Sequence, residues 1–240
     1  MKYLIPTAKE MAEKDPIAPH PLSSQSKTII QELAQYSPDQ LAKLYKIKAE
    51  ASLLEEQRWQ ELAQNKASSY PAIQLFNGLM YRQLDPEVIQ HGQDFLQNQV
   101  FITSALYGVI PANFPIQPHR LDFNCSLKVT GKSLKHYWRT DFDQAVEKEP
   151  VVSLLSSEFE TVFSPKIAKQ FIRISFQEEK DGQLKTHSTI SKKGRGLLLN
   201  QVIQHQVTDL ETIKQLNFAG FAYAPQLSEE YHLVFVKTVN

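Results

Sequence analysis

Short apolar runs along the chain predict buried β-strands. Three of them contain almost only apolar residues: Lys2–Ile5, Val100–Ser104 and Val151–Leu155. Strands with this character are typically buried on both faces, because helices cover both sides of their sheet. The run Leu233–Lys237 predicts one more strand, late in the sequence.

Alternation of apolar and polar residues begins at Ile172 and predicts a β-hairpin with one solvent-facing side. The alternating runs Ile172–Gln177 and Leu184–Ile190 flank the pair Asp181-Gly182. A pair of this type favours a tight turn between two antiparallel strands.

Helical spacing and capping residues predict where helices begin. Ser37–Gln40 has the spacing of a capping box, with proline at the first helical position, and the helical pattern continues to Leu62, with room for a break. Thr208–Glu211 has the same spacing and predicts a short helix towards Leu216. Other helix starts are predicted at Asp85-Pro86, Ser133 and Ser164-Pro165. The proline- and serine-rich stretch Lys14–Ser26 predicts a surface loop.

The order of these elements predicts the fold class. Strands and helices interleave without a regular βαβ repeat, and the hairpin lies within the series. This order is typical of an α+β fold in which helices flank a central mixed sheet. The 240 residues are 42% hydrophobic. Since such a chain can bury one large core, we expect a single domain over residues 1–240.

Charge and cysteine content narrow the expected partners and location. The 26 basic and 26 acidic residues balance, so any affinity for nucleic acid has to come from a local patch. The lone Cys125 cannot form an internal disulfide, and no Cys/His spacing suggests a zinc site, so we expect a cytoplasmic protein without a metal or cofactor. No apolar run approaches the roughly 20 residues that span a bilayer, so no membrane partner is expected.

A basic segment with two glycines, Lys192–Gly196, precedes the apolar residues Leu197–Leu199. The apolar pattern continues to Val207 as a helix, which would place the segment at the helix N-terminus. Glycines let backbone N–H groups approach a phosphate there, and Lys193 and Arg195 would add charge-assisted hydrogen bonds. A solvated basic turn is the alternative, since the segment lacks the spacing of a known phosphate loop.

A proline-stiffened loop, SALYGVIPANFPIQPHRLDF at Ser104–Phe123, is unusually long for a compact domain. Long ordered loops are often functional. Arg120 and Asp122 occupy alternate positions and would share one side of an extended segment, where they either form an ion pair or project into a cleft. His119 alone is more often a packed or surface residue than a catalytic base, and Tyr107 stands where the apolar run ends.

Polar residues also follow the apolar run that begins at Val151. Within Ser153–Phe159, Glu158 could act as a general base, and the serines could act as nucleophiles or as helix caps. Capping is the simpler role for Ser156 and Ser157, because the Gly-x-Ser-x-Gly pattern of a nucleophile elbow is lacking.

Several segments match the motifs of one bacterial protein family, in the same order along the chain. They are Phe76–Tyr81, similar to F-x-G-x-x-Y; Leu106–Val109, to LYGV; Gln117–Asp122, to PYRLE; Leu154–Phe159, to L-A-S-x-E-Y; and Lys192–Gly196, to K-K-A-R-G. Ala8-Lys9 and Trp138 stand where the family has P-A-K and F-W. The chain therefore resembles the YaaA peroxide-stress proteins over nearly its full length.

The chain departs from the family pattern at three places. After Val109 the family usually has R-P-x-D, whereas this chain has Ile110–Phe114 and lacks both charges. The family's S-P-A-K-T-L is replaced by Pro6–Met11, and Ser153 stands where the family has asparagine. Any chemistry that depends on those positions would be weakened here.

The resemblance implies a single-domain α+β fold, described for the family as cantaloupe-like, with a positively charged cleft and a helix-hairpin-helix element that binds DNA. It also implies a role in limiting free intracellular iron and oxidative damage during peroxide stress. The helical region Pro38–Leu62 could hold the DNA-binding element or could be an ordinary amphipathic helix pair.

Sequence-independent DNA binding is therefore the expected function. The expected anion-binding residues are Lys9, Arg120, Lys192, Lys193 and Arg195, and the expected cleft residues are Tyr81, Tyr107, Asp122, Trp138, Ser156 and Glu158. An enzyme acting on a phosphate-bearing small molecule or a nucleic acid is the main alternative, with catalytic residues that the sequence does not identify. A third is an interaction protein in iron handling, without a tight transition-metal site because a Cys/His cluster is lacking.

Overall fold

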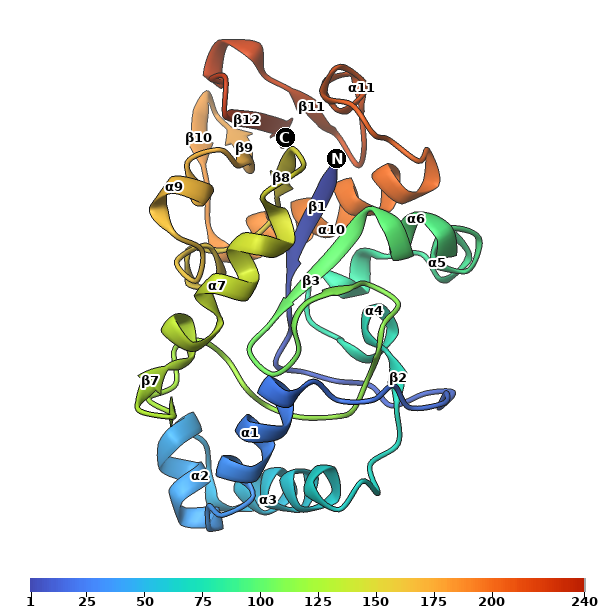
Figure 1. Cartoon of the computed structure of the whole chain (residues 1–240). Helices are drawn as coiled ribbons and strands as arrows, with labels where there is room; N and C mark the ends of the chain where they lie inside the picture. Colours follow the sequence, from blue (N-terminus) through green and yellow to red (C-terminus); the bar gives the residue numbers. More distant parts are fainter. Residues whose placement is uncertain (240) are drawn as a thin grey trace.

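An eight-stranded mixed sheet forms the centre of the computed structural model, which describes residues 1–239 (Figure 1). Its strands are β1 (Lys2–Pro6), β3 (Val100–Ser104), β4 (Gly108–Pro111), β8 (Val151–Ser153), β9 (Ile172–Lys180), β10 (Gln183–Lys185), β11 (Phe221–Tyr223) and β12 (His232–Thr238). Two short strand pairs lie outside this sheet: β2 (Tyr70–Pro71) with β5 (Pro115–Ile116), and β6 (Lys128–Val129) with β7 (Lys132–Ser133). The predicted α+β fold with a mixed central sheet is confirmed.

Parallel strands make up the interior of the sheet, in the order β11-β12-β9-β8-β1-β3-β4, with β10 paired to β9. Neighbours among β12, β9, β8, β1 and β3 run parallel, whereas β4, β10 and β11 pair antiparallel. Tyr3, Leu4 and Ile5 of β1 are fully buried, as the apolar run predicts. The third predicted strand is shorter than expected, because β8 ends at Ser153 and leaves Leu154 and Leu155 in the segment that leads to α8.

The connections of the sheet leave β1 and β8 in opposite directions. The next strand of the sheet after β1 is β3, on one side of β1, whereas β8 lies on the other side and leads away from it to β9. In open α/β sheets, ligands commonly bind where the carboxyl ends of two such strands meet, because the diverging connections leave a crevice there. The topology therefore marks the carboxyl ends of β1 and β8 as a place for a site.

Helices and 3₁₀ turns cover the sheet and extend beyond it. They are α1 (Ser24–Leu33), α2 (Pro38–Tyr45), α3 (Ala49–Ala63), α4 (Ala72–Leu75), η1 (Tyr81–Gln83), α5 (Pro86–His91), α6 (Gln93–Asn98), α7 (Leu134–Val146), α8 (Ser157–Glu160), α9 (Pro165–Ala168), α10 (Ser188–Gln204), α11 (Leu210–Gln215) and η2 (Pro225–Leu227). In Figure 1, α1, α2 and α3 gather at the end of the molecule opposite β11 and β12.

Most helix starts follow the predicted caps. Ser37 and Gln40 form the capping box of α2, and Ser133 caps α7 by accepting a hydrogen bond from the backbone of the first turn. The cap of α11 is Asp209, one residue later than the Thr208–Glu211 spacing predicts. Helix α1 contradicts the sequence-based expectation, because it begins inside the stretch predicted as a loop; its cap is Ser23.

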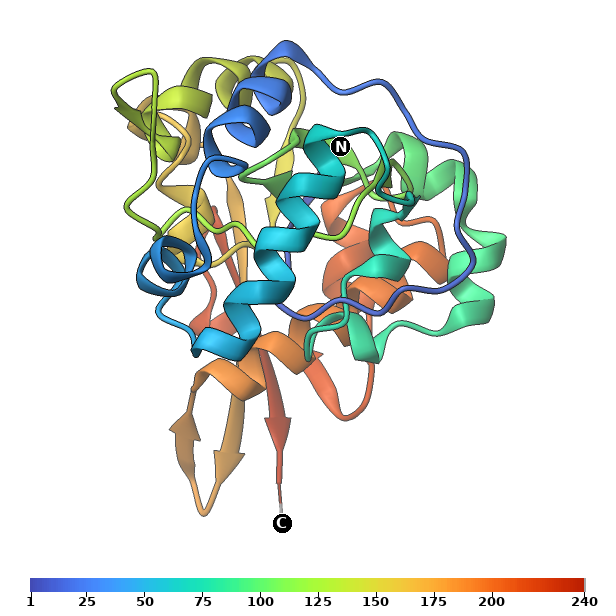
Figure 2. The same cartoon turned by 90° about the horizontal axis from the view of Figure 1, so that it is seen from below.

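The predicted hairpin is formed by β9 and β10 around Asp181 and Gly182. Both turn residues have positive φ, 53° and 74°, as a tight two-residue turn requires. The second strand of the hairpin is shorter than the predicted run Leu184–Ile190, because β10 ends at Lys185 and α10 begins at Ser188. Figure 2 shows the hairpin projecting from the body of the molecule together with the end of β12.

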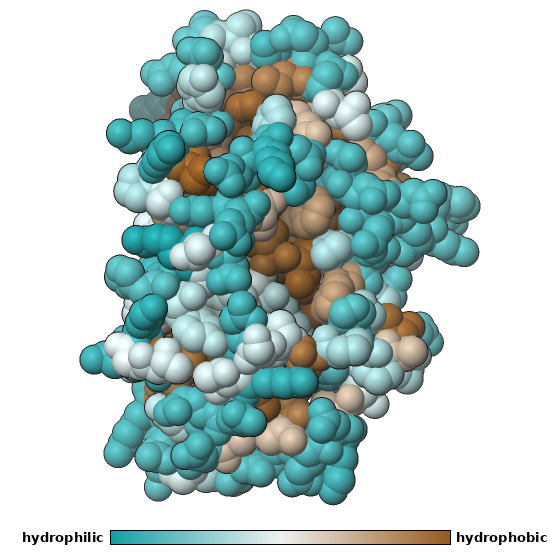
Figure 3. All heavy atoms as spheres, viewed as in Figure 1, coloured by the Kyte–Doolittle hydropathy of each residue, from teal (hydrophilic) through white to brown (hydrophobic). Residues whose placement is uncertain are grey.

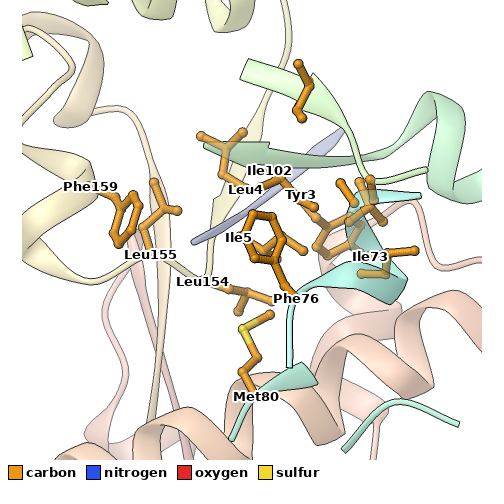
Figure 4. Packing of buried hydrophobic residues seen from close by; sticks show 14 of the residues in the cluster. Tyr3, Leu4, Ile5, Ile73, Phe76, Met80, Ile102, Leu154, Leu155 and Phe159 are labelled. Carbon is orange, nitrogen blue, oxygen red and sulfur yellow. The ribbon is translucent and has the colours of Figure 1, made fainter. Parts of the chain in front are cut away.

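One continuous hydrophobic cluster joins both sides of the sheet. Figure 4 shows part of it around Ile5, with Phe76 and Met80 near Leu154. Polar residues cover most of the face shown in Figure 3, and apolar residues are visible mainly near its centre. The core is therefore shared by all the elements that surround the ends of β1 and β8.

Candidate functional site

A cavity of about 330 Å³ lies at the carboxyl ends of β1 and β8. Its walls come from the turn after β1, the segment before η1, the loop that contains Arg120, the start of α8 and one face of α10. Its charged lining consists of Lys9, Glu10, Arg120, Asp122, Glu158, Lys192 and Arg195. The crevice that the topology marks is thus lined by cations and carboxylates from segments that are distant in sequence.

Eight of the eleven residues predicted for the site line this cavity. They are Lys9, Tyr81, Arg120, Asp122, Ser156, Glu158, Lys192 and Arg195. The structure places the other three elsewhere: Lys193 is exposed on α10, and Tyr107 and Trp138 are buried in the core. The functional role of all eleven stays a prediction.

Trp138 and Tyr107 make hydrogen bonds within the core. The Trp138 indole donates a hydrogen bond to the Ala105 carbonyl oxygen at 2.8 Å. Its ring covers Gly108, whose φ is +80° and whose hypothetical Cβ would lie 2.9 Å from it. The Tyr107 hydroxyl contacts Gln117, which braces the long loop from within. Sequence alone could not distinguish these packed aromatic residues from cleft residues.

The segment Lys192–Gly196 lies inside α10, and the expected anion site at a helix N-terminus is wrong. The helix begins four residues earlier, at Ser188, so the backbone N–H groups of this segment lie within the helical ladder. The glycines serve packing: a Cβ on Gly194 would lie 2.3 Å from the Phe176 ring, and one on Gly196 would lie 2.1 Å from the Met80 carbonyl oxygen.

Helical geometry also decides which of the three cations reach the cavity. Lys192 and Arg195 are three residues apart, so they share one face of α10, and both line the cavity. Lys193 points to solvent and is not among the lining residues. The anion-binding interpretation therefore depends on side chains from one helix face and not on backbone groups.

Arg120 and Arg195 each hold an unsatisfied donor in the interior. The Nε atom of each is buried and has no hydrogen-bond partner among residues 1–239. Burial lowers the pKa of the Arg195 guanidinium, against the opposing charge of Glu160. A buried donor without a partner costs about 1–3 kcal/mol, and more on a charged group. Both arginines also line the cavity.

The acidic side chains are held by other groups. Asp122 pairs with Lys9 at 3.1 Å and not with Arg120, so the ion pair considered for the loop does not form, and both residues line the cavity. Glu158 accepts a hydrogen bond from the Phe123 backbone at 3.2 Å. Burial raises the pKa of Glu158, and the nearby Asp122 charge raises it further. Two carboxyl groups in unlike surroundings therefore share the cavity wall.

Two further lining residues have well-defined partners. The buried Tyr81 hydroxyl donates to the Pro6 carbonyl oxygen at 2.7 Å, which fastens the 76–81 segment to the end of β1, and burial raises its pKa. His119 is 2% exposed, and its Nδ1 lies 2.8 Å from the Gln117 carbonyl oxygen. The sequence pattern favours a packed or surface role for His119, so its place in the cavity lining was not predicted. The feature of the sequence that could have indicated it is the position of His119 directly after Pro118, in a loop stiffened by prolines.

Fold and site together define an α+β protein with a cation-lined cavity at the carboxyl ends of β1 and β8, the switch point at which the connections of a largely parallel sheet diverge. Residues 1–227 match the family model described as "Peroxide stress protein YaaA", so the chain belongs to that family. The predicted family is thereby confirmed.

Relatives of similar length carry the name UPF0246 protein. One from Streptococcus pneumoniae serotype 19F (strain G54) is 51% identical over 242 residues, covering all of both chains. One from Streptococcus thermophilus (strain CNRZ 1066) is 48% identical over 243 residues, covering all of this chain and 99% of the relative. Helices of residues 1–239 include none that is long and apolar enough to span a bilayer.

Proposed function

We propose that this protein acts in the response to peroxide stress by binding DNA through phosphate contacts at the cavity, and that it thereby helps to limit free iron and oxidative damage. The observation that carries the DNA part is that three cations, Arg120, Lys192 and Arg195, line one cavity and form no ion pair with a carboxylate among residues 1–239. The iron part is supported by the family resemblance alone.

The balance of charge at the cavity favours an anionic partner. Of the lining carboxylates, Glu10 pairs with Arg82 and Asp122 pairs with Lys9. Four cations, Lys9, Arg120, Lys192 and Arg195, line the cavity against three carboxylates, Glu10, Asp122 and Glu158. A chain with zero net charge therefore has a locally positive cavity lining.

The helical hairpin of α2 and α3 is a candidate extension of this surface. Lys46, with φ +54°, ends α2, and the exposed Lys43, Lys46 and Lys48 lie at the joint of the two helices. Arg58 of α3 is instead held by Glu13 and Glu55. The Trp59 ring of α3 lies 6.2 Å from the His119 ring, centroid to centroid, so α3 borders the loop that contains Arg120. The proposed path of a bound strand leaving the cavity runs along α3 towards these lysines.

Salt dependence of DNA binding tests the proposal. We expect duplexes of unrelated sequence to bind about equally, because phosphate contacts carry no base information. Replacing Lys192 by Ala and Arg195 by Met together should flatten the slope of log K against log salt by about 1.8, or about 0.9 for each phosphate that is no longer neutralised. Fluorescence anisotropy of labelled oligonucleotides over a salt series measures both quantities.

Lys193→Ala is the matched control for this experiment. It removes one cation from the same helix, at a position outside the cavity, and should leave the slope within experimental error. An unchanged slope in the double variant would move the DNA surface to the α2–α3 joint. Failure of the unmodified protein to bind DNA at low salt would refute the proposal.

A second candidate is an enzyme acting on a phosphate-bearing small molecule. The cavity volume of about 330 Å³ lies at the lower end of the range for small-molecule sites. Glu158, with its raised pKa, and Asp122 could act as acid and base. Conversion of a 5′-nucleotide, detected by chromatography and abolished in Glu158→Gln, would establish this function. Retained conversion in that variant would exclude Glu158 from the chemistry.

A further inference from the structure

The hydrogen bond of His119 determines which ring nitrogen carries the proton. Nδ1 lies 2.8 Å from the Gln117 carbonyl oxygen, and a carbonyl oxygen can only accept, so Nδ1 is the protonated nitrogen. Burial lowers the pKa of His119 to about 4, which keeps the ring neutral at neutral pH. Nε2 is therefore a lone-pair acceptor, and it is the ring nitrogen left to meet a ligand in the cavity that His119 lines.

A buried network fixes the orientation of this acceptor. The Gln117 backbone N–H donates to the Tyr107 hydroxyl at 3.0 Å, and the Gln117 side-chain amide donates to the Ser69 hydroxyl at 3.0 Å. The rings of Tyr107 and Trp59 lie 5.3 Å and 6.2 Å from the His119 ring, centroid to centroid. Because its neighbours are packed and hydrogen-bonded, the imidazole presents Nε2 in a preorganised position.

The cavity thus combines two kinds of recognition with apolar walls. Arg120 and Arg195 line the cavity, and guanidinium donors suit the oxygens of a phosphate group. Phe76, Met80 and Phe159, labelled in Figure 4, also line the cavity and offer apolar surface. A ligand that satisfied all of these groups would carry a phosphate, an apolar or aromatic body, and a hydrogen-bond donor for His119.

We infer that the cavity binds a single nucleotide, with its phosphate on Arg120 and Arg195 and an N–H or O–H group donating to His119 Nε2. A cavity of about 330 Å³ has room for one nucleotide. The nucleotide is either a free nucleoside monophosphate or the end of a single strand. This inference rests on the proposed role of the cavity as a phosphate site.

Calorimetric titration of the full chain with AMP, adenosine and inorganic phosphate tests the inference. AMP should bind at least about tenfold more tightly than either fragment, because it engages both ends of the cavity. His119→Phe should weaken AMP binding about tenfold and leave phosphate binding unchanged, whereas His119→Gln, which keeps an acceptor, should restore part of the loss. Lys193→Ala should match the unmodified protein.

Two measurements keep the test decisive if a His119 variant does not fold. In the unmodified protein, AMP should shift the His119 Nε2 resonance in a nitrogen-15 spectrum, and inorganic phosphate should not. Titration with a 5′-phosphorylated single strand and with a duplex then separates the sources of the nucleotide. Equal affinity for AMP and phosphate, or an unmoved Nε2 resonance, would overturn the inference.

The outcomes also separate this inference from the proposed function. If DNA binds with the expected salt slope and no monophosphate binds, the nucleotide cavity is refuted and DNA binding stands. If monophosphates bind and neither DNA form does, the nucleotide cavity stands and the DNA proposal falls.

Discussion

Gly194 and Gly196 determine how closely α10 approaches its neighbours. At these two positions a methyl group would meet the Phe176 ring at 2.3 Å and the Met80 carbonyl oxygen at 2.1 Å. In an ordinary helix, exchanging Gly for Ala stabilises by up to about 1 kcal/mol. Here steric overlap opposes that gain, and the same close approach holds Arg195 and Lys192 against the cavity.

Gly196→Ala should therefore lower the free energy of unfolding by about 1–3 kcal/mol, the usual cost of overpacking a well-filled core. Urea denaturation followed by circular dichroism measures the change. Lys193→Ala is the control on the same helix, and its effect should stay within about 0.5 kcal/mol because the side chain is exposed. A stabilised Gly196→Ala protein would show that α10 can move away from η1 at little cost.

His119 should make stability depend on pH. Its pKa is lowered to about 4 by burial, with the charge of Arg58 acting in the same direction, whereas the unfolded chain has an ordinary histidine pKa near 6.5. The unfolded state thus binds a proton first as pH falls. The contribution of neutral His119 to the free energy of unfolding is complete above about pH 6.5 and is lost as the pH falls towards 4. Over that range the free energy of unfolding should change by up to about 1.4 kcal/mol per pH unit.

Urea denaturation at pH 7, 5.5 and 4.5 measures this slope in the unmodified protein and in His119→Phe. The variant lacks the titrating group, so the fall of its stability over this range should be shallower. Equal slopes in the two proteins would place the pH dependence on other groups.

At the scale of elements, capping residues are the most informative local signals in this chain. The Ser37 hydroxyl and the Gln40 side chain satisfy each other's backbone N–H groups at the start of α2. Ser164 holds the equivalent position before α9 without a side-chain cap hydrogen bond. The two serines look alike in sequence, since both precede a proline, but Ser37 alone of the two has the full capping box.

Ser37→Ala should cost about 1 kcal/mol of stability, the typical loss for an N-cap. Ser164→Ala is the matched control and should cost clearly less, because it removes no cap hydrogen bond. Chemical denaturation of both variants measures the difference. Equal losses would show that the capping box of α2 contributes no more than the backbone geometry of a serine before proline.

At the scale of the whole molecule, the sequence predicts what depends on local pattern. The buried run Lys2–Ile5 and the capping box at Ser37 each reflect near neighbours, and the structure confirms both. The start of α10 could not be predicted, because glycines in a sequence usually indicate a loop. Here Gly194 and Gly196 lie within the helix because α10 packs closely against Phe176 and Met80, which are distant in sequence. The position of His119 in the cavity lining could not be predicted for the same reason, because the other walls of the cavity come from segments that are distant in sequence.

The switch point between β1 and β8 has a consequence for synthesis of the chain. Lys9 is synthesised 186 residues before Arg195, on the opposite wall of the cavity. The cavity therefore cannot form before α10 has been synthesised. A product truncated before α10 would keep Lys9 and Arg120 and would lack Lys192 and Arg195. Ligand binding in this protein should thus report synthesis and folding of the chain through α10, and ligand in turn should protect the cavity walls against proteolysis.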